Sequence, residues 1–214
     1  MKTTDAFMPY LMPLVRGCPE PMASDALVEA AINFCEHTDL VQITTEPVIL
    51  RTGNTIDVDL PSDQVVSRVL DVWADLRHLQ VVPTVGMTSP LAFFDEVGEN
   101  RAREGQPTHA MLREPNTLTV APSVDRPYTM TARVSLRPKR TARQLADVLF
   151  DDWANAICYG AAALLAAIPG TSFGSPDTVA LGSARFTEAM GRARIEATKG
   201  KTRADIRVRM RAWP

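Results

Sequence analysis

The sequence predicts an α+β protein in which a helical bundle carries an inserted antiparallel β domain. Apolar residues recur at helical spacing in two separate parts of the chain, residues 24–38 and 145–195. Between those parts the period changes to two, which is typical of strands that bury one face. We therefore expect one N-terminal and two long C-terminal helices to form a bundle from residues 23–39 and 140–199, with the β domain over residues 40–139.

An N-terminal arm is expected over residues 1–22, which contain Pro9, Pro13, Pro19 and Pro21. Because proline lacks an amide hydrogen and fixes φ, these residues favour an irregular arm over a regular helix. A helix then starts at Ser24 or Asp25, either of which can cap the first amide groups. The apolar stripe that follows predicts that this helix packs on a large partner.

The β domain is indicated by short runs with strand-like alternation. The clearest is the last, where alternate residues from Met130 to Leu136 are apolar. Residues 52–54 (TGN) have the composition of a hairpin turn. The long loop 83–107 is polar apart from a helical pattern at residues 91–97, and such excursions often contact partners. The expected strands cover residues 41–44, 48–50, 55–60, 65–73, 78–82, 117–120 and 128–136.

The two C-terminal helices are expected to form a hairpin. The first spans about 25 residues, from Leu145 to Ile168, and ends at residues 169–170 (PG). The second starts at residues 175–177 (SPD). Small residues such as Gly160 allow the two helices to approach closely.

The C-terminal tail, residues 200–214, has a strand pattern at the end of the chain. Arginines at positions 207, 209 and 211 alternate with Ile206, Val208 and Met210. This pattern suits a strand that adds to the sheet edge of another subunit. A disordered basic tail is the equal alternative.

The net charge of −2 conceals a strong asymmetry. Residues 1–100 contain 5 Lys/Arg and 15 Asp/Glu (−10), whereas residues 101–214 contain 18 and 10 (+8). Such polarity is typical of a nucleic-acid-binding face or of subunits that stack on oppositely charged partners.

Nothing in the sequence indicates a membrane anchor, a leader or a disulfide framework. The most apolar stretch, residues 157–168, is shorter than the roughly 20 residues that span a bilayer. Residues 1–16 lack the charged start and apolar core of a signal peptide, so we expect assembly in the cytoplasm. Cys18, Cys35 and Cys158 are an odd number and are expected to be small buried hydrophobic residues.

The sequence contains no pattern that predicts catalysis, a metal site or a cofactor. The histidines, His37, His78 and His109, fall in different elements, and none stands four residues from another metal ligand. Asp57 and Asp59 share one side of an expected strand, which is typical of a solvated face. We therefore expect a protein that is not an enzyme.

A nucleic-acid-binding module is the main alternative function. Basic residues cluster before the C-terminal helices and again from Arg185 onward. The only aromatic residues near them are Phe186 and Trp213, which are too few for a base-stacking platform. The basic residues are Arg137, Lys139, Arg140, Arg143, Arg185, Arg192, Arg194, Lys199, Lys201 and Arg203.

Three stretches of the sequence together resemble the head-to-tail adaptor (connector) family of tailed bacteriophages. They are residues 17–21 (GCPEP) with 26–38, residues 133–138 (RVSLRP) with 156–161 (AICYGA), and residues 164–170 (LLAAIPG) with Pro176 and 186–194. Their order and spacing frame most of residues 13–198. The middle of the chain, residues 60–115, matches the family only in general character.

The resemblance implies a subunit of a ring, commonly twelvefold, that joins the portal protein to the tail or nozzle protein. Such a ring lines the channel through which genomic DNA passes without sequence-specific binding. It implies a location in the neck of the virion, after assembly in the host cytoplasm, and no contact with a membrane. The tail is then expected to dock into the portal with its arginines paired to acidic groups. The residues expected there are Arg203, Ile206, Arg207, Val208, Arg209, Met210, Arg211 and Trp213.

Overall fold

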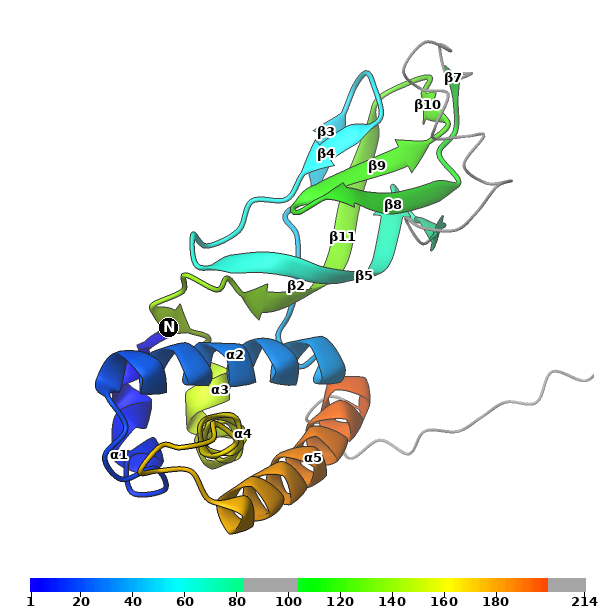
Figure 1. Cartoon of the computed structure of the whole chain (residues 1–214). Coiled ribbons are helices and arrows are strands. Elements are labelled where there is room, and N and C mark those ends of the chain that lie inside the picture. Colours follow the sequence, from blue (N-terminus) through cyan, green and yellow to red (C-terminus); the bar gives the residue numbers. More distant parts are fainter. Residues whose placement is uncertain (83–103, 200–214) are drawn as a thin grey trace, which may run out of the picture.

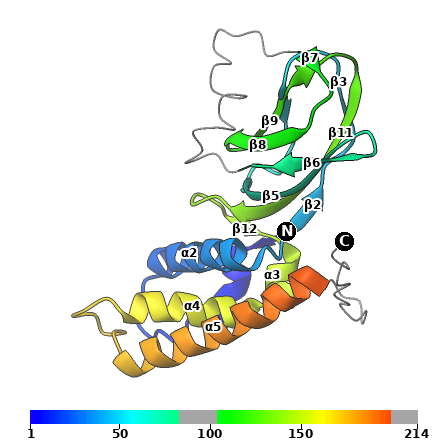
Figure 2. The ribbon, with the colours of Figure 1, turned by 90° about the vertical axis from the view of Figure 1, so that its right-hand side faces the viewer.

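The computed structural model describes residues 1–82 and 104–199, and these form a helical layer beside a large curled β-sheet (Figures 1 and 2). The expected α+β class is confirmed. The helices are η1 (Thr4–Phe7), α1 (Met8–Leu11), α2 (Glu20–Thr38), α3 (Asp147–Asp151), α4 (Ala154–Ala166) and α5 (Pro176–Lys199). The strands are β1 (Lys2–Thr3), β2 (Gln42–Thr44), β3 (Val48–Leu50), β4 (Thr55–Asp57), β5 (Gln64–Ala74), β6 (Arg77–Val81), β7 (Glu104–Gly105), β8 (His109–Glu114), β9 (Thr117–Ala121), β10 (Ser123–Val124), β11 (Tyr128–Pro138) and β12 (Gln144–Leu145).

The N-terminal arm is more ordered than expected. It contains β1, η1 and α1, and Phe7, Leu11 and Val15 are fully buried. Pro9 stands in the first turn of α1, where an amide hydrogen has no helical partner in any case. The expected start of the next helix, Ser24 or Asp25, is wrong. The helix α2 begins at Glu20, and it has a proline in its first turn, where proline is tolerated for the same reason.

An apolar core joins α1, α2, α4 and α5 within the helical layer. The ring of Phe34 in α2 lies 5.5 Å from that of Trp153 and 5.8 Å from that of Phe186 in α5. The start expected for α5 is confirmed, and its Thr178 amide donates to the Ser175 hydroxyl at 3.3 Å.

The expected helix of about 25 residues before α5 is wrong. Residues 144–145 pair with β1 as β12, and the rest is divided into α3 and α4. Asp151 and Asp152 are exposed at the break, where short polar side chains favour helix ends. Trp153 leaves helical geometry, with φ −129° and ψ 11°, and places its ring in the core.

The main sheet has eight strands in the order β2-β11-β5-β6-β8-β9-β4, and β3 also pairs with β11. It encloses a second apolar core. The expected antiparallel sheet is only partly correct, because β6 pairs with β8 in parallel, Gln80 opposite His109. A parallel pair needs a long connection, and residues 82–108 provide one.

Two expectations about turns and loops are corrected as well. Residues 52–54 do not close a paired hairpin, since the carbonyls of Gly53 and Asn54 accept from Val124 and Val120 of other strands. Within the long loop 83–107, residues 104–105 form β7, which pairs with β10. The helical pattern at residues 91–97 lies outside the described residues.

The two layers meet where α2 packs against β11. Arg137 of β11 forms an ion pair with Glu36 of α2 at 3.2 Å, and Arg68 of β5 forms one with Asp39 at 3.0 Å. The helix ends at Thr38, and the next residue, Asp39, has a left-handed φ of 50° that turns the chain from α2 into β2. Figure 2 shows the sheet above the helical layer and the N-terminus between them.

Candidate interaction sites

The tail residues that the sequence singles out, from Arg203 to Trp213, lie outside the described residues. Their expected contact with a portal therefore stays a prediction. The described residues instead present four features that bear on function: a groove in the sheet, a charged cluster on β5, two exposed aliphatic residues on α5, and a set of paired basic residues.

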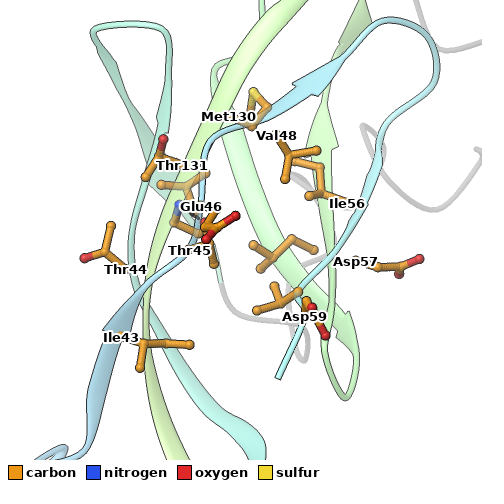
Figure 3. Close-up of a pocket in the computed structure, with 14 residues that line it drawn as sticks. Ile43, Thr44, Thr45, Glu46, Val48, Ile56, Asp57, Asp59, Met130 and Thr131 are labelled. Atoms are coloured by element: carbon orange, nitrogen blue, oxygen red, sulfur yellow. Dashed lines mark hydrogen bonds between the residues drawn. The ribbon is translucent and has the colours of Figure 1, made fainter. Parts of the chain in front are cut away.

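The groove lies between the segment that carries β2 and β3 and the segment that carries β4 (Figure 3). We call it the β-domain groove, and its volume is about 340 Å³. Its floor is apolar and belongs to the core of the sheet. The lining residues are Ile43, Thr44, Thr45, Glu46, Val48, Ile56, Asp57, Val58, Asp59, Val72, Leu118, Met130, Thr131 and Ala132.

The groove exists because β2 and β3 are separate strands. Residues 45–47 lie opposite only Thr131 and Ala132 of β11, since Thr44 pairs with Arg133 and Val48 with Met130. Pro47 has no amide hydrogen to donate to β11. The amide of Ala132 donates to the hydroxyl of Thr45 at 2.9 Å. Three residues opposite two form a bulge, and it lies beside the groove.

Acidic side chains stand on both sides of the groove. Glu46 extends from one side and Asp59 from the other, whereas Asp57 points away from it (Figure 3). The Asp57 carboxylate accepts the hydroxyl of Thr117 at 2.9 Å. Asp57 and Asp59 are both exposed, as the sequence predicts. Within the described ranges, neither Glu46 nor Asp59 has a cationic partner.

A charged cluster lies on the outer face of the sheet around Asp71. Its carboxylate accepts from His78 Nε2 at 2.9 Å and forms an ion pair with Arg133 of β11. Burial alone would raise the pKa of Asp71, but the hydrogen bonds from His78 and Arg133 outweigh it, so the pKa is lower than usual. The cluster joins three neighbouring strands, and this geometry suits cross-strand stabilisation.

The helix α5 leaves much of its surface uncovered. Only small residues of α5 are buried, namely Gly182, Ala189 and Ala193. Away from these residues, Leu181 and Ile195 are 54% and 56% exposed. They stand fourteen residues apart, and the ion pair of Arg185 and Glu188 lies between them along the helix. Exposed aliphatic side chains of this kind can pack on another surface.

Several of the clustered basic residues have acidic partners within the chain. Besides Arg137 with Glu36, Arg140 lies 3.5 Å from Glu29 and Arg185 lies 3.6 Å from Glu188. The guanidinium of Arg192 lies over the ring of Trp153 at 5.9 Å. These contacts reduce the charge available to a phosphate backbone.

The described part of the chain shows no arrangement suited to metal binding, because nowhere in it do three His, Cys, Asp or Glu side chains come together. Cys18, Cys35 and Cys158 are buried free thiols. Across residues 1–82 and 104–199, no helix combines the length and the apolar character needed to cross a membrane.

No protein-family model and no curated protein sequence matches the chain.

The sequence did not predict the β-domain groove. A feature of the sequence that could have indicated the groove is Pro47, which lies between two strand-like runs. A proline at this position indicates that the two runs do not form one continuous strand. The facing position of β4 depends on pairing with β9, and no local pattern indicates that pairing.

Proposed function

We propose that this chain is a structural subunit of a phage head-to-tail adaptor ring, which links the portal to the tail or nozzle and lines the DNA channel. The ring would consist of copies of the chain, commonly twelve, in the neck of the virion after assembly in the host cytoplasm. The proposed role is structural and involves no catalysis, cofactor or membrane. The sequence resemblance suggests this function, and its motifs fall mainly in α2, β11, α4 and α5.

The observation that carries the proposal is the exposed face of α5. Leu181 and Ile195 are exposed there, with the ion pair of Arg185 and Glu188 between them along the helix. Leu181 and Ile195 would become buried if a neighbouring copy packed on this face. In this proposal α2, α4 and α5 form a bundle that acts as the scaffold of the ring, while the β domain and the tail reach other proteins.

The charge of the tail gives a second argument. Residues 200–214 contain 5 Lys/Arg and 1 Asp/Glu. Complementary potentials would speed the association of this tail with an acidic surface of a portal.

The test is a measurement of mass with and without the portal. Purified chain alone should sediment as a monomer or a loose oligomer, and it should form a defined ring when portal is added. Light scattering or electron microscopy of the mixture would show this. A chain that never associates with portal, at concentrations well above those in an infected cell, would contradict the proposal.

The nucleic-acid alternative is favoured by one observation, the exposed Arg194 near the C-terminal end of α5 and the basic residues that follow it in the sequence. It predicts DNA binding that weakens steeply between low and moderate salt. A filter-binding titration at two salt concentrations separates it from the adaptor proposal, which requires no such affinity.

A further inference from the structure

The β-domain groove has the backbone edges needed to hold an extended segment. Among the described strands, β4 pairs only with β9 and β3 only with β11. The amide of Val58 donates to the Asn116 carbonyl at 2.8 Å, so the backbone groups of Val58 face β9. Because backbone direction alternates along a strand, those of Asp57 face the open edge. Unpaired edges of this kind are templates for an added strand.

The side chains around the groove define the chemistry of the occupant. On the inside, Val72, Leu118 and Met130 form an apolar floor. On the outside, Asp57 and Asp59 are exposed, and Glu46 stands across the groove from them. A strand added here places alternate residues inward on the apolar floor and the others outward beside these carboxylates. The fitting segment therefore alternates aliphatic and cationic residues.

We propose that the β-domain groove binds the C-terminal tail of its own chain, residues 204–212, as an added strand. Ile206, Val208 and Met210 alternate with arginines at positions 207, 209 and 211. The aliphatic side chains face the floor of the groove. The arginines face Glu46 and Asp59, where guanidinium and carboxylate groups form charge-assisted hydrogen bonds.

The start of the tail lies on the side of the helical layer that faces the sheet. In both views α5 rises toward the sheet, so its last residue, Lys199, lies at the end of α5 nearer the sheet (Figures 1 and 2). Residues 200–203 connect Lys199 to the segment that binds, and this extended connection spans at most about 18 Å. A tether this short keeps the segment near its own chain, so we expect binding within one molecule in dilute solution.

The contact gives the tail two alternative partners. In the free subunit the groove holds the tail and covers the open edges of β3 and β4. On a portal, the tail leaves the groove for the surface expected from the proposed function. The contact with the groove does not itself depend on the portal, so the two can be tested separately.

The test is disulfide trapping in the full-length chain. Asp59→Cys is combined in turn with Arg207→Cys, Arg209→Cys and Arg211→Cys. The matched control combines the same tail cysteines with Leu76→Cys, a fully exposed position in the turn between β5 and β6. The native cysteines are buried and interfere little.

We expect at least one Asp59→Cys pair to form an intrachain disulfide roughly ten times faster than its Leu76→Cys control, because a bound tail holds the thiols at a high effective concentration. Equal rates in all pairs would overturn the proposal. A disulfide that forms only between chains would also overturn it, since the occupant would then be the tail of a second copy.

A second variant tests the charges. Glu46→Gln with Asp59→Asn should expose the tail, and trypsin should then cleave at the tail arginines about ten times faster. An unchanged cleavage rate would contradict the proposal. Portal binding is measured on the same preparations. Loss of trapping with retained portal binding refutes only the groove contact, whereas trapping without portal binding refutes only the adaptor function.

Discussion

The ring of Phe186 occupies the space that a side chain at Gly160 would need. A Cβ atom on Gly160 would lie 2.7 Å from two carbons of that ring. On the same pair of helices, a Cβ on Gly182 of α5 would lie 2.7 Å from the carbonyl oxygen of Tyr159 in α4. The two glycines therefore set the distance between α4 and α5, as the sequence indicated for Gly160.

Gly182→Ala should destabilise the protein by about 1–3 kcal/mol, because the clash is with backbone and the helices must separate. Gly160→Ala should cost less, since the half-buried Phe186 ring can turn aside. The matched control is Gly191→Ala, which meets nothing within 4 Å and should stabilise the helix by up to about 1 kcal/mol. Urea unfolding of the three variants measures this order. Equal stability of Gly182→Ala and Gly191→Ala would contradict it.

Asp71→Asn should destabilise the protein at pH 7 and have a diminishing effect in acid. The folded pKa of Asp71 lies below its usual value, so its ion pairs contribute stability above the ordinary Asp pKa of about 3.9. That contribution is lost as the pH falls through the lowered folded pKa. Unfolding of variant and parent from pH 7 to pH 2 measures the difference. Asp151→Asn, at an exposed position on α3, is the control substitution.

The three native thiols should resist modification in the folded protein. Burial, with a smaller effect of Glu36 and Asp39, raises the pKa of Cys35 to about 12, and burial raises that of Cys158 to about 12. Since the thiolate is the reactive form, a colorimetric disulfide reagent at pH 8 should react slowly with the native chain and with all three thiols after unfolding. The Leu76→Cys variant should add one thiol that reacts at once. Rapid reaction of Cys35 or Cys158 in the native state would show that the helical core opens readily.

Leu181→Lys with Ile195→Lys should prevent ring formation on the portal without loss of the fold. Both side chains are more than half exposed, so the subunit itself loses little packing. A buried, unpaired lysine in a contact between copies costs several kcal/mol. Electron microscopy of mixtures with portal measures ring formation. Thr187→Lys, exposed on another side of α5, is the control and should leave the rings intact.

Deletion of residues 200–214 should abolish attachment to the portal while the remaining chain keeps its fold. The described residues supply two extensive apolar cores. A portal pull-down measures attachment, and circular dichroism checks the fold. Replacing Arg207, Arg209 and Arg211 with Glu should have the same effect in a chain of full length. If the deletion variant binds the portal as well as the parent chain does, the tail is not part of the proposed interface.

Local patterns predicted the elements whose boundaries depend on a few neighbouring residues. The start of α5 follows from Ser175 and Pro176, and β11 follows from its alternation of apolar residues. The α+β class follows from these periods alone. The break at Trp153 does not, because its backbone is set by the contact of its ring with Phe34, more than a hundred residues away.

The β-domain groove could not be predicted for a similar reason. Its two sides are close in sequence, but their separation depends on β11 and β9, which pair with them across the whole domain. The order of strands in a sheet reflects the total burial of all its strands, and no single run of residues encodes it. The sequence indicated that Asp57 and Asp59 are exposed, but it did not indicate that they lie at the rim of a groove.

The helical core combines Phe7 and Phe34 with residues 145–193, so its parts leave the ribosome at very different times. The residues of the curled sheet are complete by Pro138, before any of α4 and α5 exists. During synthesis the apolar face of α2 therefore stays exposed until α4 and α5 have been made. Ribosomes stalled once Pro138 has left the exit tunnel should present a finished β layer beside an unpaired helix, which is the kind of surface that molecular chaperones bind.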